Sequence, residues 1–257
     1  MHFIEQRKQN VLLDRNKSIG QSVQKTINLL IQGGVVQKTQ SGLNAQYFIS
    51  ENEYLRANYY SNMVANHFYH RAFIELALIK VAQYPAKGRV LRFWKEIMLL
   101  RDLFKFEFFY TNRAQFSDEI EAELALFDPK WRKVLQGSKE GIYRLLTKQN
   151  FSVAEPVLLT YLEAYQVVLK SLKNWDPQTE FNKNAFINAC IFSGKEMHWQ
   201  GDIRRLDSVS KPFLINGFRL AKNRKFTHQA DEKEAAEIEA CANLLEEITE
   251  RLSLIHI

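Results

Sequence analysis

Residues that break helices are rare in this sequence, and their scarcity limits the fold more than any other feature. Among 257 residues there are only 10 Gly and 5 Pro, while Phe occurs 18 times. Leu, Ala, Glu, Lys and Gln, which favour helices, fill the stretches between the few breakers. The sequence therefore predicts a mostly α globular protein, and its apolar content of 46% is enough for a sizeable core.

The first fifty residues have a pattern of their own. Ser18–Gly33 has the apolar spacing of an amphipathic helix. Val35-Val36 and Tyr47–Ile49 are strand-like, and they flank a turn-rich stretch at Gln40–Asn44. We expect residues 1–50 to form a small N-terminal helix-plus-β-hairpin subdomain.

Helical periodicity predicts a multi-helix domain over residues 51–251. For the helix at Val153–Trp175, Ser152 is the expected N-cap and Glu155 would complete a capping box. The final six residues, LSLIHI (252–257), resemble the translated end of a transposon used in sequencing libraries, and we expect them to be a scar of that origin. The other helices are expected at 55–83, from Gly88 towards Phe109, and at 115–127, 129–148, 182–197, 209–222 and 231–251.

The charge of the chain permits an anionic partner without identifying it. The formal net charge is +6 and the sequence pI is about 9.2, which suits nucleic acid, a phosphorylated substrate or an acidic membrane surface. No stretch approaches the roughly 20 apolar residues of a spanning helix, so we expect any membrane contact to be peripheral. Two cysteines exclude a disulfide framework.

A search for catalytic residues begins at Asn66-His67, which resembles the start of the Asn-His-x4-Asp motif of glycerolipid acyltransferases. In that motif the His is the general base and the Asp orients it. The fifth residue after His67 is Ala72, however. His70 is followed at the same distance by Glu75, but positions i and i+5 face different sides of a helix.

Metal and phosphate sites are equally hard to assemble from the sequence. His67 and His70 are three residues apart and could share a helix face, but no third ligand has suitable spacing. The glycine-rich phosphate-binding motifs are also missing from the sequence. We therefore predict that this chain carries no catalytic residues, no metal site and no cofactor.

One block of the sequence resembles a known family. In order, it reads Tyr59-Tyr60-Ser61-Asn62, His67-Phe68, Ala72, Ile74, Ala77 and Leu78. This block is similar to the C-terminal region of the glycerol-3-phosphate/dihydroxyacetone-phosphate acyltransferase family, of the bacterial and mitochondrial type. Pro156–Leu159 and Leu162–Tyr165 resemble later blocks of the same region, so that the resemblance extends over roughly residues 18–226.

The resemblance implies a function for the whole enzyme, and a limited role for this chain. Members of the family transfer a fatty acyl group from acyl-CoA or acyl carrier protein to the 1-hydroxyl of glycerol 3-phosphate. The product is lysophosphatidate, formed in the first step of phospholipid biosynthesis. The resemblance implies peripheral attachment to the cytoplasmic face of a membrane, here a bacterial inner membrane. It also implies that the catalytic domain precedes this region, so that the chain is a fragment whose first partner is that missing domain.

Two groups of polar residues are candidate contact sites. Tyr60, Asn62 and His67 belong to the block that carries the resemblance, and we interpret them as a polar seam that hydrogen-bonds a neighbouring helix or the missing domain. The second group is a basic patch that would face phosphate or lipid head groups, although a solvated helix face is the ordinary explanation. It consists of Arg204, Arg205, Arg219, Lys222, Arg224 and Lys225.

Two alternative functions remain open at this point. A helix followed by a hairpin near the N-terminus is typical of a winged-helix nucleic-acid-binding module. The basic residues of this helix and hairpin are Lys17, Lys25 and Lys38, which are too few for the usual number of phosphate contacts. We therefore expect no nucleic-acid partner. A helical partner-binding protein without any enzymatic role is the other alternative.

Overall fold

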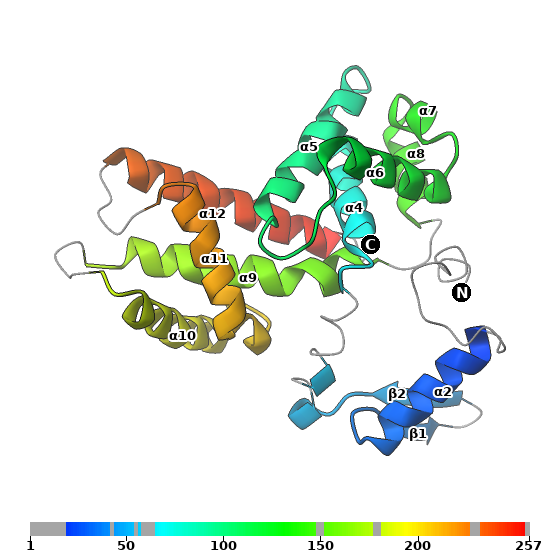
Figure 1. Ribbon diagram of the computed structural model, residues 1–257. Coiled ribbons are helices and arrows are strands. Elements are labelled where there is room, and N and C mark those ends of the chain that lie inside the picture. Colours follow the sequence, from blue (N-terminus) through cyan, green and yellow to red (C-terminus); the bar gives the residue numbers. More distant parts are fainter. Residues whose placement is uncertain are drawn as a thin grey trace. The chain divides into compact units, whose positions relative to one another are not determined.

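A computed structural model of the chain describes residues 19–41, 44–53, 56–57, 65–147, 152–176, 181–226 and 232–254. The chain divides into two compact units, Met1–Met63 and Val64–Ile257, and each is described by itself. The described regular elements are helices apart from one two-stranded hairpin, which confirms the mostly α class and the N-terminal helix-plus-hairpin pattern (Figure 1).

The first unit contains helix α2 (Ile19–Gln32), an antiparallel hairpin of β1 (Gln37–Ser41) and β2 (Asn44–Phe48), and the short 3-10 helix η1 (Glu51–Glu53). The helix is confirmed, but the first predicted strand is misplaced. Val35 and Val36 lie in the turn after α2 and donate their backbone N–H groups to Leu30 O. Val35 is buried there, at 3% exposure, which explains its apolar character without a strand.

The hairpin therefore begins later than predicted and is made largely of polar residues. Gln37 pairs with Phe48, and Ser41 pairs with Asn44 across the turn. Gln40 and Ser41, which were predicted to belong to the turn, are strand residues. Gly42 and Leu43 lie outside the described residues.

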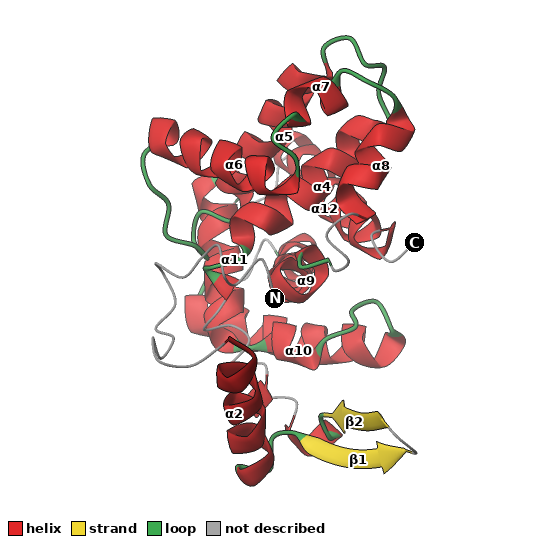
Figure 2. Ribbon diagram, turned by 90° about the vertical axis from the view of Figure 1, so that its right-hand side faces the viewer, coloured by secondary structure: helices red, strands yellow, loops and turns green. Residues whose placement is uncertain are grey.

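The second unit is built around helix α9 (Ala154–Lys173). Figure 2, which looks almost along this helix, shows α4, α10, α11 and α12 around it, and α9 contacts all four. Nearly every side of α9 is apolar, as expected for a helix that is enclosed rather than lying at a surface. The helices of this unit are α4 (Tyr69–Ala82), α5 (Arg89–Leu103), α6 (Arg113–Phe127), α7 (Trp131–Leu135), α8 (Lys139–Thr147), α9, α10 (Lys183–Gln200), η2 (Leu206–Val209), α11 (Lys211–Asn223) and α12 (Glu232–Ser253).

The first turn of α9 is capped by a residue from another helix, which corrects the predicted capping box. The N-cap position is Val153, which has no side-chain cap of its own. Instead Glu75 Oε2, from α4, accepts hydrogen bonds from the backbone N–H groups of Val153 and Ala154, each at 2.9 Å. Ser152 Oγ donates to the same oxygen at 2.9 Å. A buried carboxylate thus satisfies N–H groups that a helix start leaves without partners.

Arg71 completes this cap from the preceding turn of α4. Its Nε donates to Glu75 Oε1 at 3.0 Å, and both side chains are almost fully buried, with exposures of 1% and 3%. The guanidinium also lies over the Phe127 ring of α6, 5.0 Å from its centroid. The ion pair therefore joins α4, α6 and α9 inside the core.

Three predicted helix boundaries are wrong, each for a local reason. The expected helix 55–83 is interrupted, because residues 66–68 form a turn and α4 begins at Tyr69. The helix after Gly88 ends at Leu103 and does not reach Phe109. The expected helix 129–148 is split into α7 and α8 by a break at residues 136–138. At this break Arg89 Nη1 donates to the carbonyls of Leu135 and Gly137, each at 3.0 Å.

Helix α12 is held against α4 and α5 by a second buried ion pair. Arg251 Nη2 lies 2.6 Å from Glu96 Oε1, and Arg251 Nη1 donates to the Leu76 carbonyl at 3.2 Å. Leu252, the first residue of the predicted scar, is fully buried, while 255–257 lie outside the described residues. None of the described helices is long and apolar enough to cross a membrane.

Replacing Glu75 should show which carboxylate caps α9. We expect Glu75→Gln to lower the free energy of unfolding by about 3 kcal/mol, because it removes the negative charge beside the buried Arg71 guanidinium. The matched control is Glu155→Gln, which removes the carboxylate of the predicted capping box. Glu155 instead pairs with the half-exposed Arg204, so we expect a loss of at most about 1 kcal/mol. Urea unfolding measures both values, and equal losses, or a larger loss in the control, would show that the cap is misassigned.

Candidate functional site

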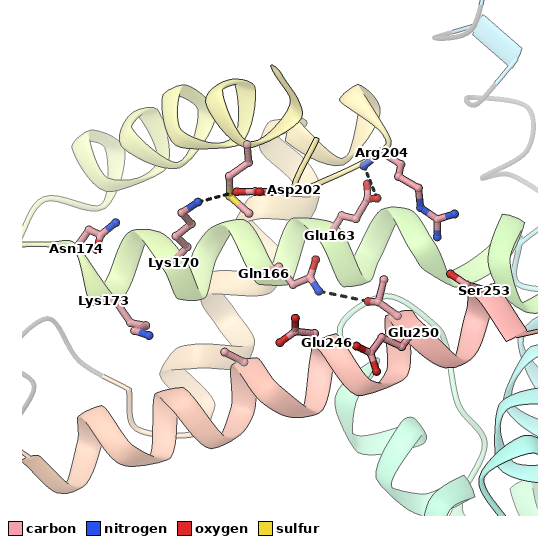
Figure 3. Close-up of a pocket in the computed structure, with 13 residues that line it drawn as sticks. Glu163, Gln166, Lys170, Lys173, Asn174, Asp202, Arg204, Glu246, Glu250 and Ser253 are labelled. Carbon is pink, nitrogen blue, oxygen red and sulfur yellow. Dashed lines mark hydrogen bonds and ion pairs between the residues drawn. The ribbon is translucent and has the colours of Figure 1, made fainter. Parts of the chain in front are cut away.

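An open groove lies beside α9 in the described part of the chain. Its volume is about 650 Å³, and it lies between α9, the end of α10 and α12 (Figure 3). Because α12 packs on α9 but not on α10, the groove remains between these two outer helices. It is lined by Glu163, Gln166, Lys170, Lys173, Asn174, Met197, Asp202, Arg204, Ala242, Glu246, Thr249, Glu250 and Ser253.

The cations of the groove are engaged in ion pairs. Lys170 Nζ donates to Asp202 Oδ2 at 3.0 Å, and Lys173 pairs with Glu239. Arg204 Nη1 donates to Glu155 Oε1 at 2.7 Å. These pairs are largely exposed, so each contributes at most about 1 kcal/mol and an anionic ligand could replace the acidic partner.

The α12 wall of the groove is acidic. Glu246 and Glu250 are one turn apart on α12, and their carboxylates extend into the space between α12 and α9 (Figure 3). Between them, Thr249 Oγ1 accepts a hydrogen bond from Gln166 Nε2 at 3.3 Å, which bridges the two walls. A groove of mixed charge is suited to polar contacts and does not resemble a closed phosphate pocket.

Glu163 fixes one end of the groove. Its side chain is 1% exposed and accepts hydrogen bonds from Arg204 N at 2.7 Å, Arg205 N at 3.0 Å and Ser208 Oγ at 2.7 Å. These donors lie at the start of η2, so Glu163 holds the loop after α10 onto α9. All of its contacts are structural, and the described lining of the groove contains no histidine or cysteine that could act as base or nucleophile.

One histidine of the described chain is oriented by a carboxylate, but outside this groove. His70 Nε2 lies 3.0 Å from Glu119 Oε2, which also accepts a hydrogen bond from Thr111 Oγ1 at 3.1 Å. The His70 ring lies against the rings of Tyr69 and Phe116, with centroids 4.0 and 5.7 Å away. The pair ties α4 to α6 within an aromatic cluster, and His70 is not among the residues that line the groove beside α9. A search for carboxylates five residues after each histidine could not find Glu119, because only the fold brings it near.

The predicted polar seam is only partly described. His67 lies in the turn at residues 66–68 and is partly exposed. Tyr60 and Asn62 lie outside the described residues, so the seam remains a prediction. Among the described residues, no group of three His, Cys, Asp or Glu side chains is placed to hold a metal ion.

The predicted basic patch is distributed over two elements. Arg204 and Arg205 lie just before η2, where Arg205 Nη1 donates to Thr160 Oγ1 at 3.1 Å. The other four lie at the end of α11. There Arg219 donates to Asn216 at 3.2 Å, and Arg224 Nη1 lies 3.3 Å from Cys241 Sγ. Lys222 and Lys225 are exposed, and Lys225 adopts the left-handed φ of 64° that ends the helix.

A partly buried carboxylate that the sequence did not reveal lies between the segment after α5, α9 and α11. Glu107 accepts hydrogen bonds from Tyr165 Oη at 2.7 Å and from Asn216 Nδ2 at 3.0 Å. Burial raises the pKa of Glu107 to about 7, although these two hydrogen bonds and the nearby Arg219 charge act in the opposite direction. Burial and the Glu107 charge also raise the pKa of the neighbouring Tyr161 and Tyr165 hydroxyls. Through these two hydrogen bonds Glu107 joins the segment after α5 to α9 and α11.

The raised pKa of Glu107 predicts how stability depends on pH. Between about pH 4.5 and 7 the folded state keeps a proton that the unfolded state has lost, so this contribution to stability is complete at low pH and disappears as the pH rises through 7. Glu107→Gln removes this titration. The free energy of unfolding of the variant, relative to the unaltered protein, should therefore rise by about 2 to 3 kcal/mol between pH 4.5 and pH 8. Denaturant titrations at both pH values measure this difference, and a pH-independent difference would contradict the assignment.

Comparison with known proteins shows the family to which the chain belongs. A family model described as the glycerol-3-phosphate acyltransferase C-terminal region matches residues 1–230. Proteins of Mycobacterium bovis and Mycobacterium tuberculosis named "putative acyltransferase plsB1" are 30% identical over 213 residues. The match covers 82% of this chain but 34% of theirs, so the chain spans about a third of the length of these relatives. No solved structure matches it.

Proposed function

Because the chain belongs to the family of glycerol-3-phosphate acyltransferase C-terminal regions, we propose that it is the helical region that supports the catalytic domain of such an enzyme. The whole enzyme would transfer an acyl group from acyl-CoA or acyl carrier protein to glycerol 3-phosphate, at a membrane surface. The observation that carries this proposal is the family match over residues 1–230. The match covers only about a third of the M. tuberculosis relative, so that protein is long enough to contain a further domain.

The described side chains favour support over catalysis. Acyl transfer to an alcohol needs a base beside the hydroxyl and donors that stabilise the oxyanion. The buried carboxylates Glu75 and Glu163 and the partly buried Glu107 instead accept hydrogen bonds from neighbouring helices and loops. His70, which has a suitable carboxylate partner, is packed among aromatic rings. These groups give a rigid frame against which another domain could be held.

The groove beside α9 is a second surface of this region at which a ligand could bind. Its cations are bound to acids by weak, exposed pairs, and its α12 wall is acidic. A phosphorylated substrate would meet Glu246 and Glu250 on entering, which disfavours a role as the glycerol 3-phosphate site. We therefore assign substrate binding to the missing catalytic domain.

The alternative of nucleic-acid binding receives no support from the hairpin unit. Helix α2 carries Lys25 as its single basic residue, and β1 adds Lys38, whose ammonium lies 5.9 Å from the centre of the Tyr47 ring. With Arg56, the described part of this unit carries three basic residues, which would neutralise too few phosphates for appreciable affinity.

The purified chain should not catalyse acyl transfer by itself. Incubated with glycerol 3-phosphate and a long-chain acyl-CoA, it should form no lysophosphatidate above the uncatalysed background, because the described lining of the groove beside α9 has no histidine or cysteine that could act as base or nucleophile. Product extraction with radiolabelled glycerol 3-phosphate measures this directly. Turnover by the chain that disappears in His70→Ala would overturn the supporting role and make the His70–Glu119 pair catalytic.

A further inference from the structure

Helix α10 carries two large aromatic side chains on its outer face. Phe192 is 67% exposed and Trp199 is 83% exposed. With the exposed Lys195 between them, they occur at positions i, i+3 and i+7, which fall on one side of a helix. We call these three residues the α10 aromatic face.

The rest of α10 holds this face in a fixed orientation. Phe186, Ile187, Cys190 and Met197 are buried on the inner side of the helix, which packs on α9, α11 and η2. Gly194 makes the closest approach, because a Cβ atom there would lie 2.8 Å from Val209 Cγ1 and 3.3 Å from Val167 Cγ1. The aromatic side chains are therefore presented to solvent by a helix that cannot rotate to bury them.

Helix α10 and the elements that follow it, η2 and α11, carry a net positive charge. From Lys183 to Lys225, which spans α10, η2 and α11, nine Lys and Arg residues stand against three acidic residues. Glu196 is the single acid of α10. Helix α12, which packs on α9, is the opposite, with Glu residues along its length. A net charge of this sign on one pair of packed helices favours an anionic partner.

We propose that the α10 aromatic face binds the surface of an anionic lipid bilayer. Trp is the side chain most suited to the head-group region, because its ring is apolar and its N–H can bond to water or lipid oxygens. A lysine between two aromatic anchors extends its ammonium to lipid phosphates while its methylenes stay on the apolar rings. The proposal deepens the proposed function, since it rests on an acyltransferase that works at a membrane surface, and it names the face that makes the contact.

A protein partner fits this face less well. Two aromatic side chains bury at most about 150–250 Å² each, whereas a stable interface buries about 800 Å² on each partner. Peripheral membrane contact needs less apolar area, because a few inserted side chains act together with attraction between basic residues and acidic lipids.

Vesicle binding by the whole chain tests the proposal. The unaltered protein should co-sediment with vesicles of phosphatidylglycerol and phosphatidylcholine, and less with vesicles of phosphatidylcholine alone. The double variant Phe192→Ser/Trp199→Ser should bind the acidic vesicles at least about tenfold more weakly, and Lys195→Glu should weaken binding several-fold. Circular dichroism should be unchanged, because none of the three side chains is buried.

A matched control uses two exposed aromatic residues from elsewhere in the second unit. Phe109 and Tyr143 are 91% and 40% exposed, and the double variant Phe109→Ser/Tyr143→Ser should bind vesicles like the unaltered protein. Tryptophan emission supplies an independent signal. Addition of acidic vesicles should shift the emission to shorter wavelength, and Trp199→Phe should abolish most of that shift while leaving much of the binding.

Three outcomes would overturn the proposal. They are no binding of the unaltered protein to acidic vesicles, equal binding by the Phe192→Ser/Trp199→Ser variant, and a self-associated protein in solution that this variant converts to monomer. The last result would assign the face to a second copy of the chain. None of these measurements uses a substrate. A negative vesicle result would therefore not contradict the proposed acyltransferase function. A negative result in the activity assay would likewise not contradict vesicle binding.

Discussion

The Glu75 carboxylate determines where the central helix of the second unit begins, and the packing of the other helices depends on that position. It accepts two backbone N–H groups at the start of α9, while Arg71 neutralises it within the core. Helix α9 in turn contacts α4, α10, α11 and α12. A shift of its first turn would move the apolar side chains that meet each of these neighbours, such as Leu158, Leu162 and Val168. The cap is therefore a tertiary contact with consequences throughout the unit.

The same use of charged groups recurs across the unit and bears on its function. Glu163 holds the loop after α10, Arg89 holds the end of α7, and the Arg251–Glu96 pair holds α12. Buried charges of this kind cost solvation free energy and are retained where their hydrogen bonds are satisfied from within. Because these groups are engaged inside the core, they are not available to a substrate. A rigid helical frame with polar and aromatic outer surfaces agrees with a region that supports a catalytic domain.

Local sequence patterns predicted the class of fold, most helices and the family, but not the contacts that position the elements. Helices α2, α9 and α10 were found because their apolar spacing is periodic, and the block around His67 identified the family. The capping box at Ser152 was wrong because the competing carboxylate, Glu75, lies 77 residues earlier in the sequence. Pairing of His70 with Glu119, and burial of Glu107 beneath Tyr165, likewise arise only when distant helices pack. The first strand was predicted at Val35-Val36 because both residues are apolar. Val35 is apolar for a different reason, since it is buried in the turn after α2.

The most direct test of the central claim, that this region is required for acyl transfer without performing it, is an activity comparison within a longer relative. The M. tuberculosis protein can be assayed with glycerol 3-phosphate and acyl-CoA, both whole and after removal of the region that matches this chain. We predict that the truncated protein loses most of its activity although its own catalytic residues are retained, because the frame that holds its catalytic domain is gone. Full activity of the truncated protein would contradict a supporting role for this region.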